Sequence, residues 1–322
     1  MRRRQALLGV LALAGAAVMR DARAQKKLVI GLLDAGNRPE WWLGFRQQMR
    51  ELGYIEGKTV FFEERFASGK ADLLAAYARE LVQRDVALIV TAGTSAALEA
   101  KRASAKIPIV MATGADHVSL GLAVSLSRPG RNVTGNSTVG SELTAKRFAL
   151  LREMFPKMTR LAVLWHSENI GSMPAVRDLE AVARSSKVTL QNLGIASAAE
   201  LPQAFAAAAQ ERAEALFVVA GPLTFPERKR IAELAIKHRL PTMHGPGEYV
   251  EAGGLASYSP NYRDFFRRAA ITADKILKGA KPGELPIEEP TKFDFTINLK
   301  TAKALGVTIP KAVLLRADRV IE

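Results

Sequence analysis

Several apolar runs of this 322-residue chain are followed by residues that could bind a ligand. The most informative of these groups is Gly93, Thr94 and Ser95. They stand before an Ala-Ala-Leu run, which predicts a helix start with unpaired backbone N–H groups and two O–H donors. The helix dipole and these donors favour negative charge, so the pattern suits a carboxylate. N-capping by Thr94 or Ser95 is the alternative, and one hydroxyl can cap while the other meets a ligand.

Further candidate ligand contacts lie in loops after other apolar runs. Asp116 suits a ligand ammonium, or it caps a helix predicted at residues 117–125. Asn169 suits a polar ligand group, or it forms an Asx-turn. Trp41 or Trp42 at a cleft mouth could stack on an aromatic ligand, and one of them is expected to pack under its own helix. Loops after the predicted strands contribute four more candidate contacts: Asn37, Ser167, Thr224 and Tyr249.

Catalytic chemistry has little support in the sequence. The chain has four histidines and no cysteine, so general bases and metal ligands are few and thiolate sites are excluded. Only His166 and His244 fall at predicted strand ends, and no G-x-S-x-G elbow accompanies them. No Walker loop or G-x-G-x-x-G follows the first strand. We expect a binding cleft without metal or cofactor; an exported enzyme that uses both histidines as acid–base groups is the alternative.

Alternating strands and helices must position these loops. Runs that are apolar at every position suit strands buried on both faces of a parallel sheet, and patterns at 72–84 and 262–278 suit helices with one apolar face. Ligands bind beyond the carboxyl ends of such strands. The sequence predicts an α/β fold of two doubly wound parallel-sheet lobes joined by a multi-strand hinge. The predicted strands form two groups of five: 28–33, 59–66, 87–92, 107–112 and 132–138, then 160–165, 188–194, 215–220, 241–244 and 255–259.

The lobe boundaries follow from where the chain crosses between these two groups. The N-terminal lobe is predicted to hold residues 25–140 and about 260–285, and the C-terminal lobe residues 141–259 and about 286–322. The first crossover is expected near 139–143, and the helix at 262–278 is expected to return to the first lobe. The tail is predicted to add a strand and a short helix, at 292–297 and 299–305.

The N-terminus has the pattern of an export signal. Arg2, Arg3 and Arg4 precede an apolar stretch too short to span a bilayer, and Ala22 and Ala24 permit cleavage before Gln25. We expect residues 1–24 to be a cleaved signal peptide and the mature protein to lie in the periplasm. Without cysteine, no lipid anchor is expected. A buried N-terminal helix is the alternative, and the arginines fit both general secretion and twin-arginine export.

Composition and charge narrow the class of protein. Apolar residues make up 48%, charged residues 24% and aromatic residues 7%, which excludes a disordered chain, a coiled coil and a polytopic membrane protein. The net charge of +14 falls to about +10 without residues 1–24, which hold five arginines and one aspartate. The remaining basic residues are scattered, as on a solvated surface, so no nucleic-acid partner is expected. A LacI-like regulator would need an N-terminal helix-turn-helix where this chain has an export signal.

Several segments together carry a resemblance to one family. The mature chain resembles the ABC transporter substrate-binding proteins of the tryptophan/tyrosine-transporter-like group, which have the type I periplasmic binding protein fold. The matching segments are FRQQMRELGYIEGK (45–58), RPGRNVTG (128–135), EAGGLASY (251–258), LKGAKP (277–282), PTKF (290–293) and INLKTAKALG (297–306).

The resemblance implies a function and a distribution of roles. The protein would be a monomeric, non-enzymatic receptor without a cofactor that closes its two lobes on a small solute and delivers it to a membrane permease. The solute would be an aromatic amino acid or a related carboxylate. Gly93, Thr94 and Ser95 would hold its carboxylate, and three residues would line the remaining polar surface: Asp116, Asn169 and Tyr249.

Overall fold

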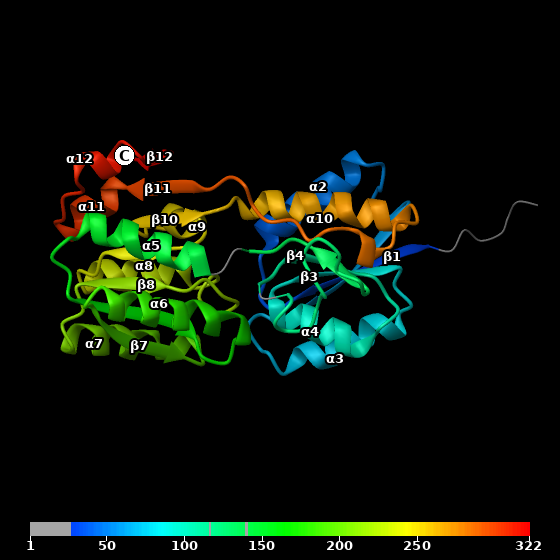
Figure 1. Ribbon diagram of the computed structural model, residues 1–322, viewed down its shortest axis with the longest axis horizontal. Helices are drawn as coiled ribbons and strands as arrows, with labels where there is room; N and C mark the ends of the chain where they lie inside the picture. The colour runs from blue at the N-terminus through cyan, green and yellow to red at the C-terminus, as the bar shows by residue number, and fades with distance from the viewer. Residues whose placement is uncertain (1–26, 116, 139–140) are drawn as a thin grey trace, which may run out of the picture.

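The computed structural model describes residues 27–115, 117–138 and 141–322, which form two α/β lobes side by side (Figure 1). The predicted signal peptide and Asp116 therefore lie outside the described residues. The fold is the predicted one: each lobe has its own sheet, and helices cover both faces.

The first lobe contains an all-parallel sheet. Its strands are β1 (Leu28–Asp34), β2 (Val60–Phe66), β3 (Leu88–Ala92), β4 (Ile109–Thr113) and β5 (Val133–Gly135). Their order is β2-β1-β3-β4-β5. Every residue of β3 and β4 is buried, and each strand is apolar except for one threonine, as expected of strands covered on both faces.

Four helices cover this sheet. They are α2 (Pro39–Glu51), α3 (Leu73–Gln83), α4 (Thr94–Ala103) and α10 (Tyr262–Leu277). Helix α10 packs along α2 and against β4, so this late segment of the chain returns to the first lobe as expected (Figure 1). Helices α3 and α4 pack together on the other face. Residues 117–125 form turns, so the helix predicted there was wrong.

The second lobe contains a seven-stranded sheet. Its strands are β6 (Arg160–His166), β7 (Thr189–Ile195), β8 (Ala215–Val218), β9 (Thr242–His244), β10 (Ala256–Ser259), β11 (Asp294–Asn298) and β12 (Arg319–Ile321). Their order is β12-β11-β10-β9-β8-β6-β7. Strand β11 runs antiparallel to β10, because the chain re-enters this lobe from the first lobe in the opposite direction. Strand β12 was not predicted.

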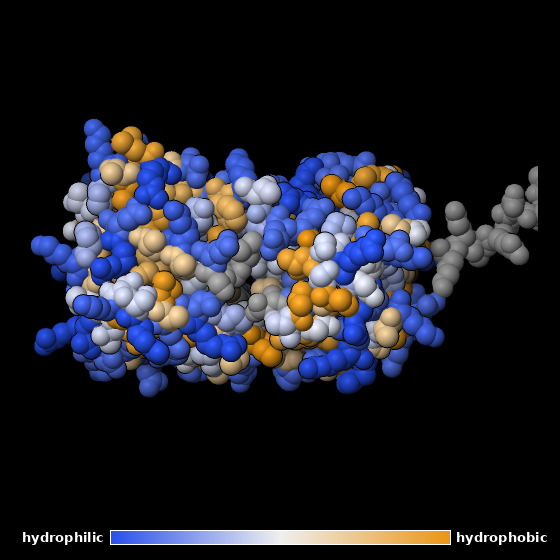
Figure 2. Space-filling view, viewed as in Figure 1, coloured by the Kyte–Doolittle hydropathy of each residue, from blue (hydrophilic) through white to orange (hydrophobic). Residues whose placement is uncertain are grey.

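The helices of the second lobe are mostly short. They are α5 (Ser141–Met154), α6 (Met173–Ser185), α7 (Leu201–Gln210), α8 (Arg228–Lys237), α9 (Glu248–Glu251), α11 (Leu299–Leu305) and α12 (Lys311–Leu314), with 3-10 turns η1 (Ile170–Ser172) and η2 (Ala198–Glu200). A third 3-10 turn, η3 (Pro282–Glu284), packs against β5 of the first lobe. No helix of the described chain is long and apolar enough to span a membrane. The face seen in Figure 2 is mainly hydrophilic, with small apolar patches.

The chain passes between the lobes three times: between β5 and α5, at residues 260–261 between β10 and α10, and at residues 286–293 before β11. The first and third pair with each other, since the Glu288 N–H donates to the Gly135 carbonyl (2.9 Å) and the Ser137 N–H donates to the Glu288 carbonyl (2.8 Å). The crossover predicted near 139–143 falls partly outside the described residues. The predicted boundaries of the lobes stay a prediction.

Candidate functional site

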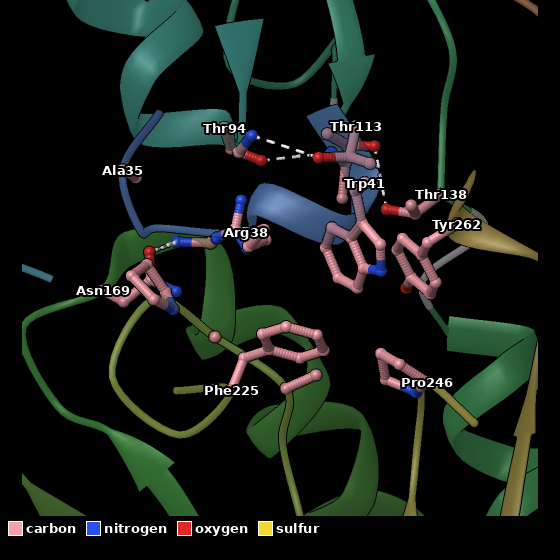
Figure 3. Close-up of a pocket in the computed structure, with 17 residues that line it drawn as sticks. Ala35, Arg38, Trp41, Thr94, Thr113, Thr138, Asn169, Phe225, Pro246 and Tyr262 are labelled. Atoms are coloured by element: carbon pink, nitrogen blue, oxygen red, sulfur yellow. Dashed lines mark hydrogen bonds between the residues drawn. The ribbon is translucent and has the colours of Figure 1, made fainter. Parts of the chain in front are cut away.

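A cavity lies between the lobes, at the carboxyl ends of strands from both sheets (Figure 3). About 620 Å³ within it is free of protein atoms, its open mouth included, and it lies where parallel sheets usually bind their ligands. Loops that follow strands supply most of its lining. The lining residues are Ala35, Arg38, Trp41, Gly93, Thr94, Thr113, Gly114, Ala115, Thr138, Asn169, Gly171, Ala220, Gly221, Pro222, Phe225, Pro246 and Tyr262.

The N-terminus of α4 forms the polar end of this cavity. Gly93 has a φ of +95°, a conformation that favours glycine, and its N–H donates to Thr113 Oγ1 at 3.2 Å. The Ala97 N–H bonds to the Gly93 carbonyl, so the N–H groups before it have no acceptor within the helix. Thr94 Oγ1 accepts the Ala115 N–H at 3.1 Å, which leaves the hydroxyl proton free to donate (Figure 3). These groups can bind a carboxylate.

Ser95 and Asn169 link the two lobes beside this polar end. Ser95 Oγ donates to Asn169 Oδ1 at 3.3 Å. Asn169 also accepts the Gly171 N–H (3.2 Å) and donates to Ser172 Oγ (2.8 Å), so it is held in an Asx-type turn and still lines the cavity. Ser95 itself is not a lining residue. Its hydroxyl is used for contact between the lobes.

Aromatic side chains form another wall. The Trp41 ring stacks on Tyr262 with centroids 4.7 Å apart, and it meets Phe225 of the second lobe at 4.5 Å (Figure 3). Trp42 instead packs in the core of the first lobe, where its Nε1 donates to Asp34 at 2.9 Å. Of the two adjacent tryptophans, Trp41 therefore faces the cavity. Its exposed fraction of 4% shows that the surrounding contacts are tight.

A buried ion pair fixes the loop that leads into α2, the helix that carries Trp41. Asp34 ends β1 with no exposed surface and accepts from the Gly36 N–H (2.7 Å), Arg38 Nη1 (2.7 Å) and Trp42 Nε1 (2.9 Å). Helix α2 then begins with proline at its first position, which suits a helix start because proline lacks an N–H. Arg38 is thereby held in the cavity lining.

The remaining predicted residues do not line the cavity. Asn37 and Ser167 are exposed. Thr224 and Tyr249 are fully buried behind the aromatic wall, where the Tyr249 hydroxyl donates to Thr224 Oγ1 at 3.0 Å and the ring meets Phe225 edge-on. They support Phe225. The roles of these residues in binding stay predictions.

Among the lining residues that were not predicted as contacts, five have polar or aromatic side chains: Arg38, Thr113, Thr138, Phe225 and Tyr262. Thr113 ends a strand, and Arg38 and Phe225 lie in loops after strands, so the strand-end rule could have found them. Tyr262 opens the helix that returns to the first lobe, and only the crossing of the chain places it beside Trp41.

Neither histidine proposed for catalysis reaches the cavity. His166 on β6 and His244 on β9 are buried, and β8 lies between their strands. Burial lowers the pKa of His244 to about 3 and also lowers the pKa of His166, so both favour the neutral form. His244 contacts Thr242 and stacks on Tyr249, as a core residue does. Across the described ranges, no cluster of three or more potential ligand residues could hold a metal.

Two doubly wound lobes around a cavity are the architecture of the periplasmic binding proteins. The chain belongs to the family of ABC transporter substrate binding proteins, which matches residues 29–321. Members of this family bind small-molecule solutes, work with a membrane permease and are extracytoplasmic.

Three relatives illustrate the similarity. A tyrosine-binding protein of Clostridioides difficile (strain R20291) is 25% identical over 288 residues, which cover 89% of this chain and 83% of the relative. The structure of an ABC domain in complex with L-Trp from Streptococcus pneumonia has a TM-score of 0.84 and 25% identity, covering 92% of this chain and 100% of that one. A conserved domain protein from Vibrio cholerae has a TM-score of 0.85 with the same identity and coverage.

Proposed function

We propose that this protein is the periplasmic receptor of an ABC importer for an aromatic amino acid or a closely related aromatic carboxylate. The observation that carries the proposal is that the same cavity has a helix N-terminus and hydroxyl groups at one end and an aromatic wall beside them. The relatives that are named for tyrosine or bound to L-Trp support the same class of solute. In this proposal the receptor acts as an exported monomer without catalytic activity or a cofactor.

Binding and closure are one process in this proposal. The solute carboxylate accepts hydrogen bonds from the free N–H groups of α4 and from Thr94, each contributing about 1.5–3 kcal/mol. Its ring lies on the wall formed by Trp41 and Phe225. Since Phe225 belongs to the second lobe, the wall is complete only when the lobes meet. The solute therefore shifts the population toward the closed form, which the permease distinguishes from the open form.

Isothermal titration calorimetry with L-tryptophan, L-tyrosine and L-phenylalanine tests this function. We expect binding of at least one of them, and none of tryptamine, which lacks the carboxylate, or of L-alanine, which lacks the ring. Absence of binding by all three amino acids would refute the solute class. Equal binding of tryptamine and L-tryptophan would refute the carboxylate role of α4. Recovery of the bound amino acid unchanged separates a receptor from the alternative enzyme.

Thr94→Val tests the polar end directly, because valine keeps the shape of the side chain and removes the hydroxyl. We expect the affinity for the amino acid to fall about tenfold or more, the loss of one hydrogen bond to a charged group. Thr189→Val is the matched control, since Thr189 is exposed on β7. An unchanged affinity of Thr94→Val would remove this hydroxyl from the site.

A further inference from the structure

The first turn of α2 contacts the second lobe through two polar interactions beside the cavity. Trp41 Nε1 donates to Glu248 Oε1 at 2.6 Å, and Glu40 accepts from Arg228 Nη2 at 2.9 Å. Glu248 opens α9, and Arg228 opens α8, so both partners belong to the second lobe. Neighbouring residues of one helix turn thus fasten the first lobe to the second.

The bond to Glu248 satisfies the polar atom of a tightly packed ring. Trp41 contacts Tyr262, Phe225 and Phe266 with its faces and edges. These apolar contacts leave the indole N–H as its polar group, and burying that group without an acceptor is costly. The carboxylate of Glu248 lies outside the cavity lining and receives this N–H from the side. It therefore fixes the rotation of the ring that forms the wall.

We propose that Glu248 is the positioning residue for Trp41: as a hydrogen-bond acceptor supplied by the second lobe, it holds the indole in the orientation in which it packs with Phe225 and lines the cavity that takes the solute ring. The inference rests on the proposed function for the identity of the solute. When the lobes separate, Trp41 loses this acceptor, so the wall is ordered only when the lobes are in contact. A solute that holds the lobes together also orders its own binding surface.

Nuclear magnetic resonance of the ¹⁵N-labelled indole groups tests the contact without any ligand. The chain has three tryptophans, so three indole cross-peaks are expected. Glu248→Ala should shift the Trp41 peak toward the position of an unbonded N–H, whereas Glu248→Gln, which keeps an acceptor oxygen, should restore most of the original shift. Trp165 is an internal control, because its N–H donates to Asn192 at 2.6 Å within the second lobe. A shift of both peaks together would indicate general loosening and would overturn the positioning role.

Titration with L-tryptophan tests the consequence for binding. Glu248→Ala should weaken affinity about tenfold or more, and Glu248→Gln should recover most of it. Glu251→Ala is the matched control on the same helix, since Glu251 pairs with Arg319 inside the second lobe, and its affinity should equal that of the wild type. If the wild type binds no aromatic amino acid, the proposed function fails while the indole spectra still decide the role of Glu248. Unchanged spectra and affinity in Glu248→Ala would overturn the proposal.

Discussion

Replacing Asp34 with alanine should destabilise the protein at Arg38 and at the start of α2, the helix that carries Trp41 and Trp42. Asp34 is fully buried and accepts hydrogen bonds from the Gly36 N–H, the Arg38 guanidinium and the Trp42 indole at 2.7, 2.7 and 2.9 Å. Only 5% of Arg38 is exposed. Asp34→Ala therefore leaves a buried cation without its carboxylate and a buried indole N–H without its acceptor.

The size of the effect follows from these contacts. Removing one partner of a buried ion pair costs about 3–5 kcal/mol, because the remaining charge stays desolvated. We therefore expect the free energy of unfolding to fall by about 3–5 kcal/mol in Asp34→Ala. Asp34→Asn should cost less, because its amide oxygen still accepts one of the bonds. Combining Asp34→Ala with Arg38→Met should recover part of the loss, because the unpaired charge is then absent.

Urea unfolding followed by circular dichroism measures these differences. Glu288→Ala is the control: Glu288 and Arg268 form an ion pair at 3.9 Å in which both side chains are exposed, so the loss should be below about 1 kcal/mol. If the free energy of unfolding of Asp34→Ala falls by no more than that of this control, the reasoning is refuted. Additive losses in the double variant would show that Asp34 and Arg38 are not energetically coupled.

Two further predictions concern pH. Burial raises the pKa of Glu248, so joining the lobes favours its protonated form. The affinity for L-tryptophan should therefore increase as pH falls from neutral toward the ordinary range of glutamate. In Glu248→Gln the affinity should depend less on pH. The charged groups around Glu248 are Glu40, Arg228, Glu251, Arg263, Asp294, Asp318 and Arg319. Burial also lowers the pKa of His117 to about 4 and that of His244 to about 3, from 6.5 in an exposed histidine. The unfolded chain therefore binds more protons below pH 6.5, so the free energy of unfolding should fall by up to about 1.4 kcal/mol per pH unit for each ring. Urea unfolding at pH 7, 6 and 5 measures this slope, and a flat profile would contradict the burial argument.

The sequence by itself determined all the strands but β12, most of the helices and the loops that reach the cavity. Short, almost wholly apolar runs such as those of β3 and β4 are typical of buried parallel strands. Because the carboxyl ends of parallel strands meet at one edge, the loop after each strand was a candidate without knowledge of the ligand. Four predicted contacts line the cavity for this reason: Trp41, Gly93, Thr94 and Asn169.

Only the tertiary structure decided which side chains of those loops face the cavity. Successive residues of a helix point about 100° apart, so Trp41 and Trp42, or Thr94 and Ser95, are distinguished only by what packs against each of them. Tyr262 and Phe225 meet Trp41 because the chain crosses between the lobes, an event that no local pattern encodes. Strand β11 runs antiparallel to β10 because the chain crosses between the lobes before it. Local periodicity specifies which face of an element is apolar, whereas the partner of that face is set by long-range packing.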